Sequence, residues 1–386
     1  MITRVFDRVV APLRQFIDSA PEELLEQPPL ADEGSRRGQA GPAADDEFAR
    51  LALDLFALQF AHNEPYRRLC AARGVTPANV AHWTHFPAMP TAGFKELDVT
   101  CLPPRARTAV FHSSGTTGHR PSRHYHSPQS LEIYETSLWA WFRRSVGVCP
   151  DKLLILTPTP AHAPHSSLVH MFDTIRRRAL NSSSVFLGKV EPTGGWSLDL
   201  EATLAALQRA AASGRRVLVL GTAFSYVHLL DHLAAQRVRI ALPPGSRALE
   251  TGGYKGRSRA LSKSQLHSLL SARLGIPPTD ILCEYGMSEL SSQAYDQPRL
   301  SAKPAAASVL RHFRFPPWVR AQVVSPETGR EVAEGETGLI RVVDLANVFS
   351  VLAVQTEDLG LRHADGFELL GRSPLAEPRG CSLAAA

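Results

Sequence analysis

The sequence predicts an α/β protein in which a mostly parallel sheet is covered by helices and is followed by a small antiparallel β region. In the middle of the chain, short apolar strands alternate with helix-length segments, which is typical of a parallel sheet. Beyond Arg311 the helical patterns stop, and short strands separated by turn signals predict antiparallel hairpins. With 386 residues, the chain is long enough for more than one structural unit.

The N-terminal region, residues 1–105, is expected to be helical. Apolar residues recur at helix spacing from Val5 to Phe16. Residues 34–42 predict a connector, after which Asp45 and Asp46 are expected to cap a second helix.

Strands and helices then alternate through residues 106–310, and hairpins follow in residues 311–372. We expect strands at residues 106–111, 122–126, 152–156, 185–187, 216–220, 247–251, 281–285, 319–324, 338–343 and 351–354. Helices are expected from residue 127 and at residues 166–178, 197–212, 224–236 and 262–274. Residues 373–386 form a short tail. Several strands end in glycine-containing loops, and open α/β sheets place their ligands at that edge.

Composition excludes several classes of protein. The net charge of +5 comes from arginines in short clusters without interleaved aromatic residues, which argues against a nucleic-acid surface. No apolar run approaches the roughly 18 residues of a membrane span, and the N-terminus does not resemble a signal peptide. Five scattered cysteines argue against a disulfide framework and for a reducing, cytoplasmic location.

Two kinds of catalytic centre are also disfavoured. Six histidines crowd one region, yet they lack the carboxylate or cysteine partners that would close a metal site: His119, His124, His126, His162, His165 and His170. A G-x-S-x-G elbow, which would indicate a hydrolase, is missing from the sequence.

The central motif is a loop rich in hydroxyl groups and glycine after the strand at 106–111. It consists of Ser113, Ser114, Gly115, Thr116, Thr117 and Gly118. Glycines let successive backbone N–H groups point into one concavity, and hydroxyls add donors, so the loop suits a polyphosphate. It lacks the lysine and the spacing of the Walker loop. The alternative is an ordinary polar hairpin turn.

Four further motifs follow in order. They are Thr-Gly-Gly-Tyr-Lys-Gly at 251–256, Glu-Tyr-Gly-Met-Ser-Glu at 284–289, Thr-Glu-Asp-Leu-Gly at 356–360 and Gly-Phe-Glu-Leu-Leu-Gly-Arg at 366–372. With the central loop, their order and spacing resemble the adenylate-forming superfamily of acyl-CoA synthetases, luciferases and adenylation domains. The resemblance runs from about residue 106 to residue 372 and implies the N-terminal-domain fold of that superfamily.

Closer features resemble the acyl-protein synthetases of the bacterial bioluminescence fatty-acid reductase system. They are Asn-Glu-Pro-Tyr at 63–66, Phe-Lys at 94–95, Ser-Ser-Leu at 166–168 with Met171, Gly-Thr-Ala-Phe at 221–224 and Arg-Gly-Cys-Ser-Leu at 379–383. Each is weak alone, but together they cover most of the chain.

The motifs supply candidate nucleotide-binding residues. The loop of residues 113–118 is expected to hold the β- and γ-phosphates of ATP through its N–H and hydroxyl donors. Gly252, Gly253 and Gly286 let backbone approach a flat base, against which Tyr254 or Tyr285 stacks. The alternative is a tight turn over a core tyrosine.

The charged candidates each have a plainer alternative. Glu289 is expected to bind Mg²⁺, as hard cations prefer carboxylate oxygen, although an isolated Glu is more often a solvated surface residue. Asp358 is expected to accept hydrogen bonds from the ribose hydroxyls, or else to sit in a turn. Arg372 reaches the ribose or phosphates, or else closes a hairpin in solvent. Lys255, and less so Lys95, could offset the charge of the approaching carboxylate.

The tail departs from ordinary synthetases. Fourteen residues follow Arg372 and none is lysine, so the resemblance implies a truncated C-terminal domain without the catalytic lysine of that superfamily. Cys381 lies beside Arg379, and the resemblance implies that this thiol accepts the acyl group; an inert tail cysteine is the alternative.

Together these features predict an ATP- and Mg²⁺-dependent acyl-protein synthetase. It activates a carboxylate, expected to be a fatty acid, as acyl-AMP and passes it through a thioester to a reductase or a carrier protein. Three alternatives remain: a ligase resembling phenylacetate–CoA ligase, a free-standing enzyme that loads a carrier protein, and a regulatory subunit that binds nucleotide without turnover.

Overall fold

The computed structural model describes residues 2–20, 42–113, 120–147, 151–179, 183–192, 195–252, 261–300 and 309–373. The chain forms two compact units. The first contains residues 1–112, 122–145 and 286–377, and the second contains residues 113–121, 146–285 and 378–386. Within the described ranges, no helix is long and apolar enough to cross a membrane.

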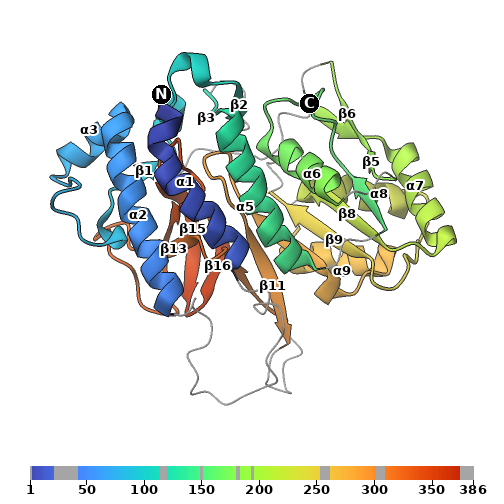
Figure 1. The fold of residues 1–386 in the computed structure, drawn as a ribbon. Coiled ribbons are helices and arrows are strands. Elements are labelled where there is room, and N and C mark those ends of the chain that lie inside the picture. Colours follow the sequence, from blue (N-terminus) through green and yellow to red (C-terminus); the bar gives the residue numbers. More distant parts are fainter. Residues whose placement is uncertain are drawn as a thin grey trace. The chain divides into compact units, whose positions relative to one another are not determined.

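The second unit is built on the predicted parallel sheet. Its strands are β4 (Lys152–Ile155), β5 (Val185–Phe186), β8 (Val217–Thr222), β9 (Arg247–Thr251) and β10 (Ile281–Tyr285). They lie in the order β10-β9-β8-β4-β5, and each neighbouring pair is parallel (Figure 1). Strands β8 and β10 are buried along their whole length, as expected of a sheet covered on both faces.

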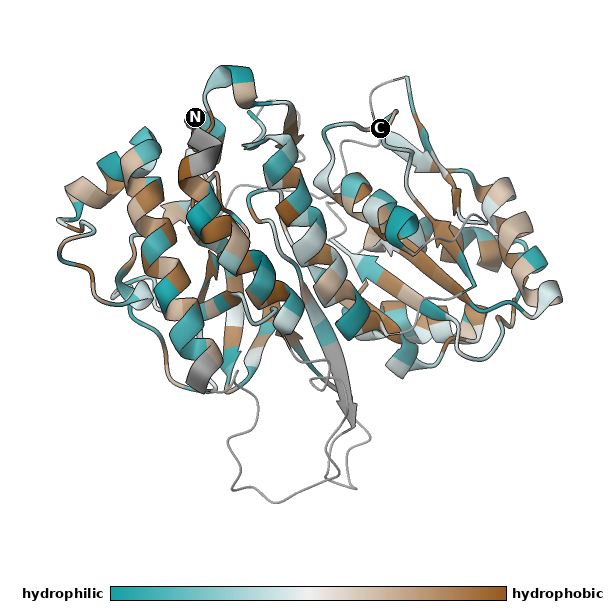
Figure 2. Ribbon diagram, viewed as in Figure 1, coloured by the Kyte–Doolittle hydropathy of each residue, from teal (hydrophilic) through white to brown (hydrophobic). Residues whose placement is uncertain are grey.

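The strand order reverses between β4 and β8. From β4 the chain moves outward to β5 through α6 (Ser167–Arg178), whereas α7 (Leu200–Ser213), α8 (Ala223–Ala235) and α9 (Lys263–Leu274) accompany steps in the opposite direction. Because crossovers are right-handed, α6 covers one face and α7 to α9 cover the other. Apolar side chains of α7, α8 and α9 share one core with strand residues such as Val217 and Val219, and Figure 2 shows the apolar colouring of these strands.

The first unit contains the antiparallel strands. They are β11 (Ala294–Leu300), β12 (Val309–Arg314), β13 (Val319–Val324), β14 (Thr337–Asp344), β15 (Ala353–His363) and β16 (Gly366–Arg372). Their order is β13-β14-β15-β16-β12-β11, and β1 (Met89–Pro90) pairs in parallel with β15. The predicted antiparallel region is therefore confirmed, but β15 extends well beyond the expected residues 351–354. The Thr-Glu-Asp-Leu-Gly motif consequently lies in a strand.

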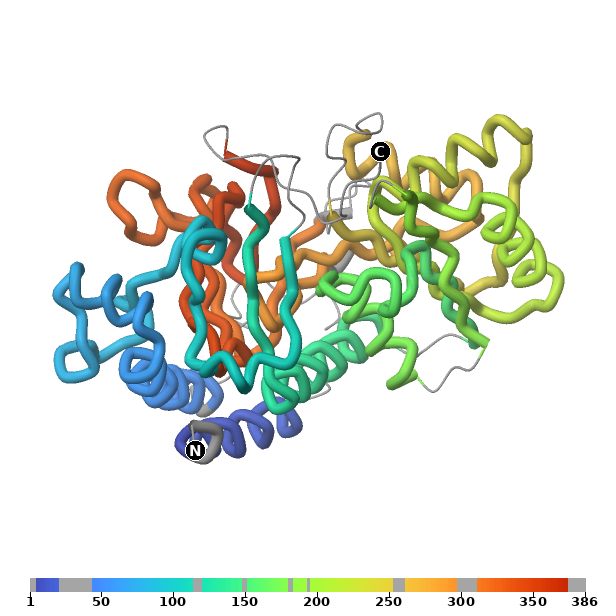
Figure 3. The backbone as a smooth tube through the Cα atoms, turned by 90° about the horizontal axis from the view of Figure 1, so that it is seen from above, coloured from blue at the N-terminus to red at the C-terminus, as the bar shows by residue number. Residues whose placement is uncertain are grey.

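Helices α1 (Ile2–Ser19), α2 (Pro42–His62), α3 (Glu64–Ala72) and α5 (Pro128–Val146) belong mainly to the same unit. Helices α1 and α2 lie side by side (Figures 1 and 3). Helix α2 begins before Asp45, so this residue lies in the first turn instead of capping the helix as expected. Its carboxylate pairs with Arg320 at 2.5 Å. The expected connector lies outside the described residues except for Pro42.

The central loop joins the two strands of a hairpin. Strands β2 (Ala109–His112) and β3 (Arg123–His126) pair antiparallel and run next to each other (Figure 3). Strand β2 starts later than expected because Pro104–Ala106 forms a 3-10 turn. The expected helix at residues 197–212 also starts later, at Leu200, since Trp196–Leu198 pairs with Gly188–Val190 and Asp199 caps α7.

Gln59 ties α2 to the segment before β15. Its Nε2 donates to the carbonyls of Asn347 (2.8 Å) and Val348 (3.1 Å), and its Oε1 accepts from the amide of Leu352 at 2.8 Å. The side chain is completely buried.

We expect Gln59→Leu to lower the free energy of unfolding by about 3 kcal/mol, because buried backbone groups lose their partners. Urea denaturation measures the change. Gln236→Leu, at an exposed position, serves as the control and should change stability by less than about 0.5 kcal/mol. Equal effects of the two substitutions would contradict the proposed tie.

Candidate active site

The parallel strands of the second unit end at the same level. Thr222 of β8 lies opposite Thr251 of β9, which lies opposite Glu284 of β10. The sheet therefore brings Gly252 and Tyr285 to one edge, the edge at which open α/β sheets bind ligands. Gly252 has a φ of 73°, a left-handed conformation that favours glycine. Tyr285 is buried, and its role in stacking stays a prediction.

Two buried carboxyl groups to which the sequence assigns no role lie at this edge. Glu284 accepts a hydrogen bond from the Thr251 hydroxyl, and Glu250 lies 3.3 Å from Nε2 of the buried His267. Burial raises the pKa of Glu284 to about 7, and the nearby charge of Glu250 acts in the same direction. A sequence signal existed, since each acid follows apolar residues within a predicted strand.

The Gly-Thr-Ala-Phe motif closes the end of β8. The Thr222 hydroxyl caps α8 by accepting from the amide of Ser225 at 3.0 Å, and the Ser225 hydroxyl donates to the carbonyl of Leu156 at 3.2 Å. A Cβ atom on Gly221 would lie 2.9 Å from Cδ1 of Leu156. These contacts give the motif a structural function at the reversal between β4 and β8.

In the first unit, Glu289 is completely buried, so the alternative of a solvated surface residue is wrong. The Ser288 hydroxyl donates to its Oε2 at 3.0 Å. Nδ2 of Asn347 donates to its backbone carbonyl at 2.9 Å. These contacts hold a carboxylate in a fixed place after β10.

Asp344 anchors the residues that follow Glu289. Its carboxylate accepts from the amides of Ser291 and Ser292 (both 2.9 Å), from the Ser292 hydroxyl (2.8 Å) and from the amide of Ala346 (2.9 Å). Burial raises the pKa of Asp344 to about 6, although these four hydrogen bonds oppose the shift.

Asp358 and Arg372 are brought together by the pairing of two motifs. They lie opposite each other on β15 and β16, and Nε of Arg372 is 3.6 Å from Oδ1 of Asp358. Arg372 also pairs with Glu357. Asp358 therefore lies in a strand and not in a turn. Arg372 is half-buried and paired with two acids, and its role at the nucleotide stays a prediction.

The remaining candidates lie outside the described residues: Ser114, Gly115, Thr116, Thr117, Gly118, Gly253, Tyr254, Lys255 and Cys381. Ser113 is half-buried at the end of the hairpin, and Gly286 follows β10 directly. Within the described part of the chain, no group of three or more His, Cys, Asp or Glu side chains could hold a metal ion. The convergence of all candidates on one nucleotide site stays a prediction.

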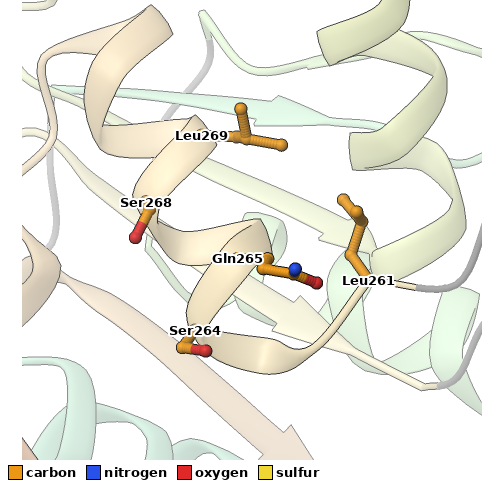
Figure 4. A pocket seen from close by; sticks show the side chains of 5 residues that line it. All are labelled: Leu261, Ser264, Gln265, Ser268 and Leu269. Carbon is orange, nitrogen blue, oxygen red and sulfur yellow. The ribbon is translucent and has the colours of Figure 1, made fainter.

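A surface depression on α9 offers no chemistry for catalysis. Leu261, Ser264, Gln265, Ser268 and Leu269 line it (Figure 4). None of these side chains is titratable, and Gln265 is engaged in capping α9 through Ser262.

Burial of Glu284 predicts a pH-dependent stability. Because the pKa of Glu284 rises from 4.5 in the unfolded chain to about 7, the folded state binds the proton more tightly. Stability therefore falls as pH rises from about 4.5 to about 7, by up to about 3 kcal/mol from this group. We expect Glu284→Gln to flatten this slope in urea denaturation between pH 5 and 8.

A smaller slope should remain in the variant from Asp344, whose pKa is also raised. The exposed Glu327→Gln is the control and should leave the wild-type slope unchanged. If Glu284→Gln leaves the pH dependence of stability unaltered, Glu284 does not have the raised pKa.

Comparison with known proteins identifies relatives along most of the chain. Residues 44–386 match the family described as "Acyl-protein synthetase, LuxE". A long-chain-fatty-acid–luciferin-component ligase of Vibrio harveyi is 22% identical over 351 residues, which cover 87% of this chain and 86% of that protein. The protein of the same name from Aliivibrio fischeri is 21% identical over 355 residues, with 87% of each chain covered.

Solved structures share the fold. An open conformation of 2-hydroxyisobutyryl-CoA ligase, in complex with 2-HIB-AMP and CoA, superimposes with a TM-score of 0.60 and 16% identity. The match covers 89% of this chain and 80% of that one. The same ligase in its thioesterification state gives a TM-score of 0.59 and 16% identity, covering 89% and 71% of the two chains. The fold is thus that of adenylate-forming ligases. The chain belongs to the acyl-protein synthetase family, LuxE, and is an ATP-dependent, AMP-forming ligase.

Proposed function

We propose that this protein activates a long-chain fatty acid as acyl-AMP and holds the acyl group as a thioester on Cys381 for delivery to a reductase. The family match over residues 44–386 is the observation that carries the proposal, as it spans all five motifs and Cys381. The names of the two relatives support a long-chain fatty acid as the substrate.

In the first half-reaction, a fatty-acid carboxylate oxygen attacks the α-phosphorus of ATP. The bond between the α-phosphorus and the bridging oxygen breaks, and pyrophosphate leaves with the electron pair. We assign the phosphates to the loop of residues 113–118, whose N–H and hydroxyl donors offset the charge that develops on them. Gly252, Gly253 and Gly286, with Tyr254 or Tyr285, are assigned to the adenine.

The residues around Glu289 fit Mg²⁺ bound together with ATP. The Glu289 carboxylate and the Ser288 hydroxyl are hard oxygen donors held 3.0 Å apart in the protein interior. Mg²⁺ characteristically takes one or two carboxylates and completes its coordination with substrate phosphates and water, so the protein need not supply a full ligand set. When bound, the ion would neutralise charge on the leaving pyrophosphate.

Asp358 and Arg372 suit the ribose. A carboxylate can accept from both ribose hydroxyls, and the arginine opposite it across β15 and β16 holds it in orientation. The pairing of Arg372 with Glu357 restricts the guanidinium to this end of the hairpin. Lys255 is assigned to the approaching carboxylate and α-phosphate.

In the second half-reaction, the Cys381 thiolate attacks the acyl carbonyl and AMP leaves. The cysteines in the described part of the chain support this choice. Cys70, Cys101 and Cys283 are buried, and burial raises the pKa of Cys70 to about 11 and that of Cys101 further, which disfavours the nucleophilic thiolate. These free thiols also suit a cytoplasmic location. Cys149 lies outside the described residues and needs a direct test.

The most direct test is intact mass after incubation with MgATP and long-chain fatty acids. We expect one added acyl group in the wild type, removed by hydroxylamine, and none in Cys381→Ser. Cys149→Ser and Cys70→Ala are the controls and should retain the adduct.

Acyl transfer only to CoA or to a carrier protein would favour a rival ligase. Failure to exchange labelled pyrophosphate into ATP in the presence of fatty acid would favour a regulatory subunit. Retention of the adduct in Cys381→Ser would show that another residue accepts the acyl group.

The metal assignment gives a separate prediction. We expect Glu289→Gln to lower fatty-acid-dependent pyrophosphate exchange by at least about tenfold at saturating ATP, because an amide binds Mg²⁺ far less well than a carboxylate does. Circular dichroism verifies that the variant is folded. Exchange at the wild-type rate would remove Glu289 from the metal site.

A further inference from the structure

Strand β3 buries two histidines on one face of the hairpin that carries the central loop. His124 and His126 are 2% and 1% exposed, while Arg123 and Tyr125 between and beside them face outward. The two imidazole rings pack at a centroid distance of 4.3 Å, and Phe94 packs against His124 at 6.3 Å. The hairpin therefore holds the His124 ring in a fixed orientation.

His124 contacts the backbone of the residue before Glu289. Its Nδ1 lies 2.7 Å from the backbone carbonyl of Ser288. A carbonyl oxygen can only accept, so Nδ1 carries the proton and the imidazole donates. This carbonyl belongs to the peptide group that joins Ser288 to Glu289. The imidazole thus acts on the backbone beside Glu289.

The peptide group on the other side of Glu289 is held as well. Nδ2 of Asn347 donates to the Glu289 carbonyl at 2.9 Å and to the Val351 carbonyl at 3.0 Å. His124 from β3 and Asn347 after β14 therefore hydrogen-bond to the backbone on the two sides of the buried Glu289. Such an arrangement fixes the backbone from which the Glu289 side chain extends, and the Ser288 hydroxyl holds the carboxylate itself.

We propose that His124 is a positioning residue that aims the Glu289 carboxylate at the Mg²⁺ of MgATP. The inference rests on the proposed assignment of Glu289. A group that orients a metal ligand by a hydrogen bond typically contributes a factor of 10–100 to metal affinity. Because His124 gives its Nδ1 proton to the backbone, it holds the peptide before Glu289 and leaves the carboxylate oxygens for other partners.

The test measures the equilibrium affinity for a non-hydrolysable ATP analogue with and without Mg²⁺, by calorimetry on the full chain. His124→Phe keeps a ring beside Phe94 but removes the donor, whereas His124→Asn keeps a donor near the position of Nδ1. His126→Leu is the matched control on the same face. We expect His124→Phe to reduce the gain in affinity from Mg²⁺ by about tenfold, with Mg²⁺-free affinity within twofold of wild type.

We further expect His124→Asn to recover most of the gain and His126→Leu to retain it. His124→Leu replaces His124→Phe if the phenyl ring prevents folding. An equal loss of affinity with and without Mg²⁺ would mean a general structural role and overturn the inference. The inference would also be overturned if His124→Phe kept the full gain in affinity from Mg²⁺, or if His124→Asn failed to recover that gain.

Glu289→Gln separates this inference from the proposed function. If Glu289→Gln loses the Mg²⁺ gain while His124→Phe keeps it, Glu289 remains the metal ligand and only the inference on His124 fails. If Glu289→Gln keeps the gain in affinity from Mg²⁺, Glu289 is not the metal ligand, and the inference on His124 fails as well.

Discussion

The most consequential interaction in the described structure is the set of four hydrogen bonds that the buried Asp344 carboxylate accepts. They fix the amides of Ser291, Ser292 and Ala346 and the Ser292 hydroxyl. Removal of a carboxylate from water is costly, and such an ion is tolerated only where donors replace its hydration. Through these bonds the residues after Glu289 are tied to the end of β14, and the position of Glu289 depends on that tie.

A second constraint is the register of the parallel strands. Thr222, Thr251 and Glu284 lie level on β8, β9 and β10, so loops that are far apart in the sequence start from one edge. Gly221 permits the close approach of Leu156 at the reversal of strand order, where a larger side chain would collide. The strand register and the small size of Gly221 therefore set the positions of the loops that follow these strands.

The two units bring their candidate residues together in different ways. In the parallel unit, the ends of strands gather residues from successive loops. In the antiparallel unit, cross-strand pairing sets Asp358 opposite Arg372, and long-range side-chain bonds from Gln59, His124 and Asn347 hold irregular backbone in place. Both arrangements hold polar side chains at fixed positions.

The sequence alone determined the fold class, most strands and helices, and membership of an acyl-protein synthetase family. Hydrophobic periodicity and cap residues are local, and the five motifs keep their order along the chain, so both can be read without coordinates. The predicted start of α7 is wrong because pairing with Gly188–Val190, rather than local propensity, makes Trp196–Leu198 a strand.

Only the tertiary structure decided which polar residues are buried and what they hold. In isolation, Glu289 has the sequence context of an exposed acid, and His124 is one of six histidines in one region of the chain. Their burial, and the contact of His124 with the Ser288 carbonyl 164 residues away, arise from packing in the folded chain. Packing likewise buries Glu250 next to His267 and close enough to Glu284 to affect its pKa. A linear pattern records which residue types are present, but burial and hydrogen bonding depend on neighbours that only the folded chain supplies.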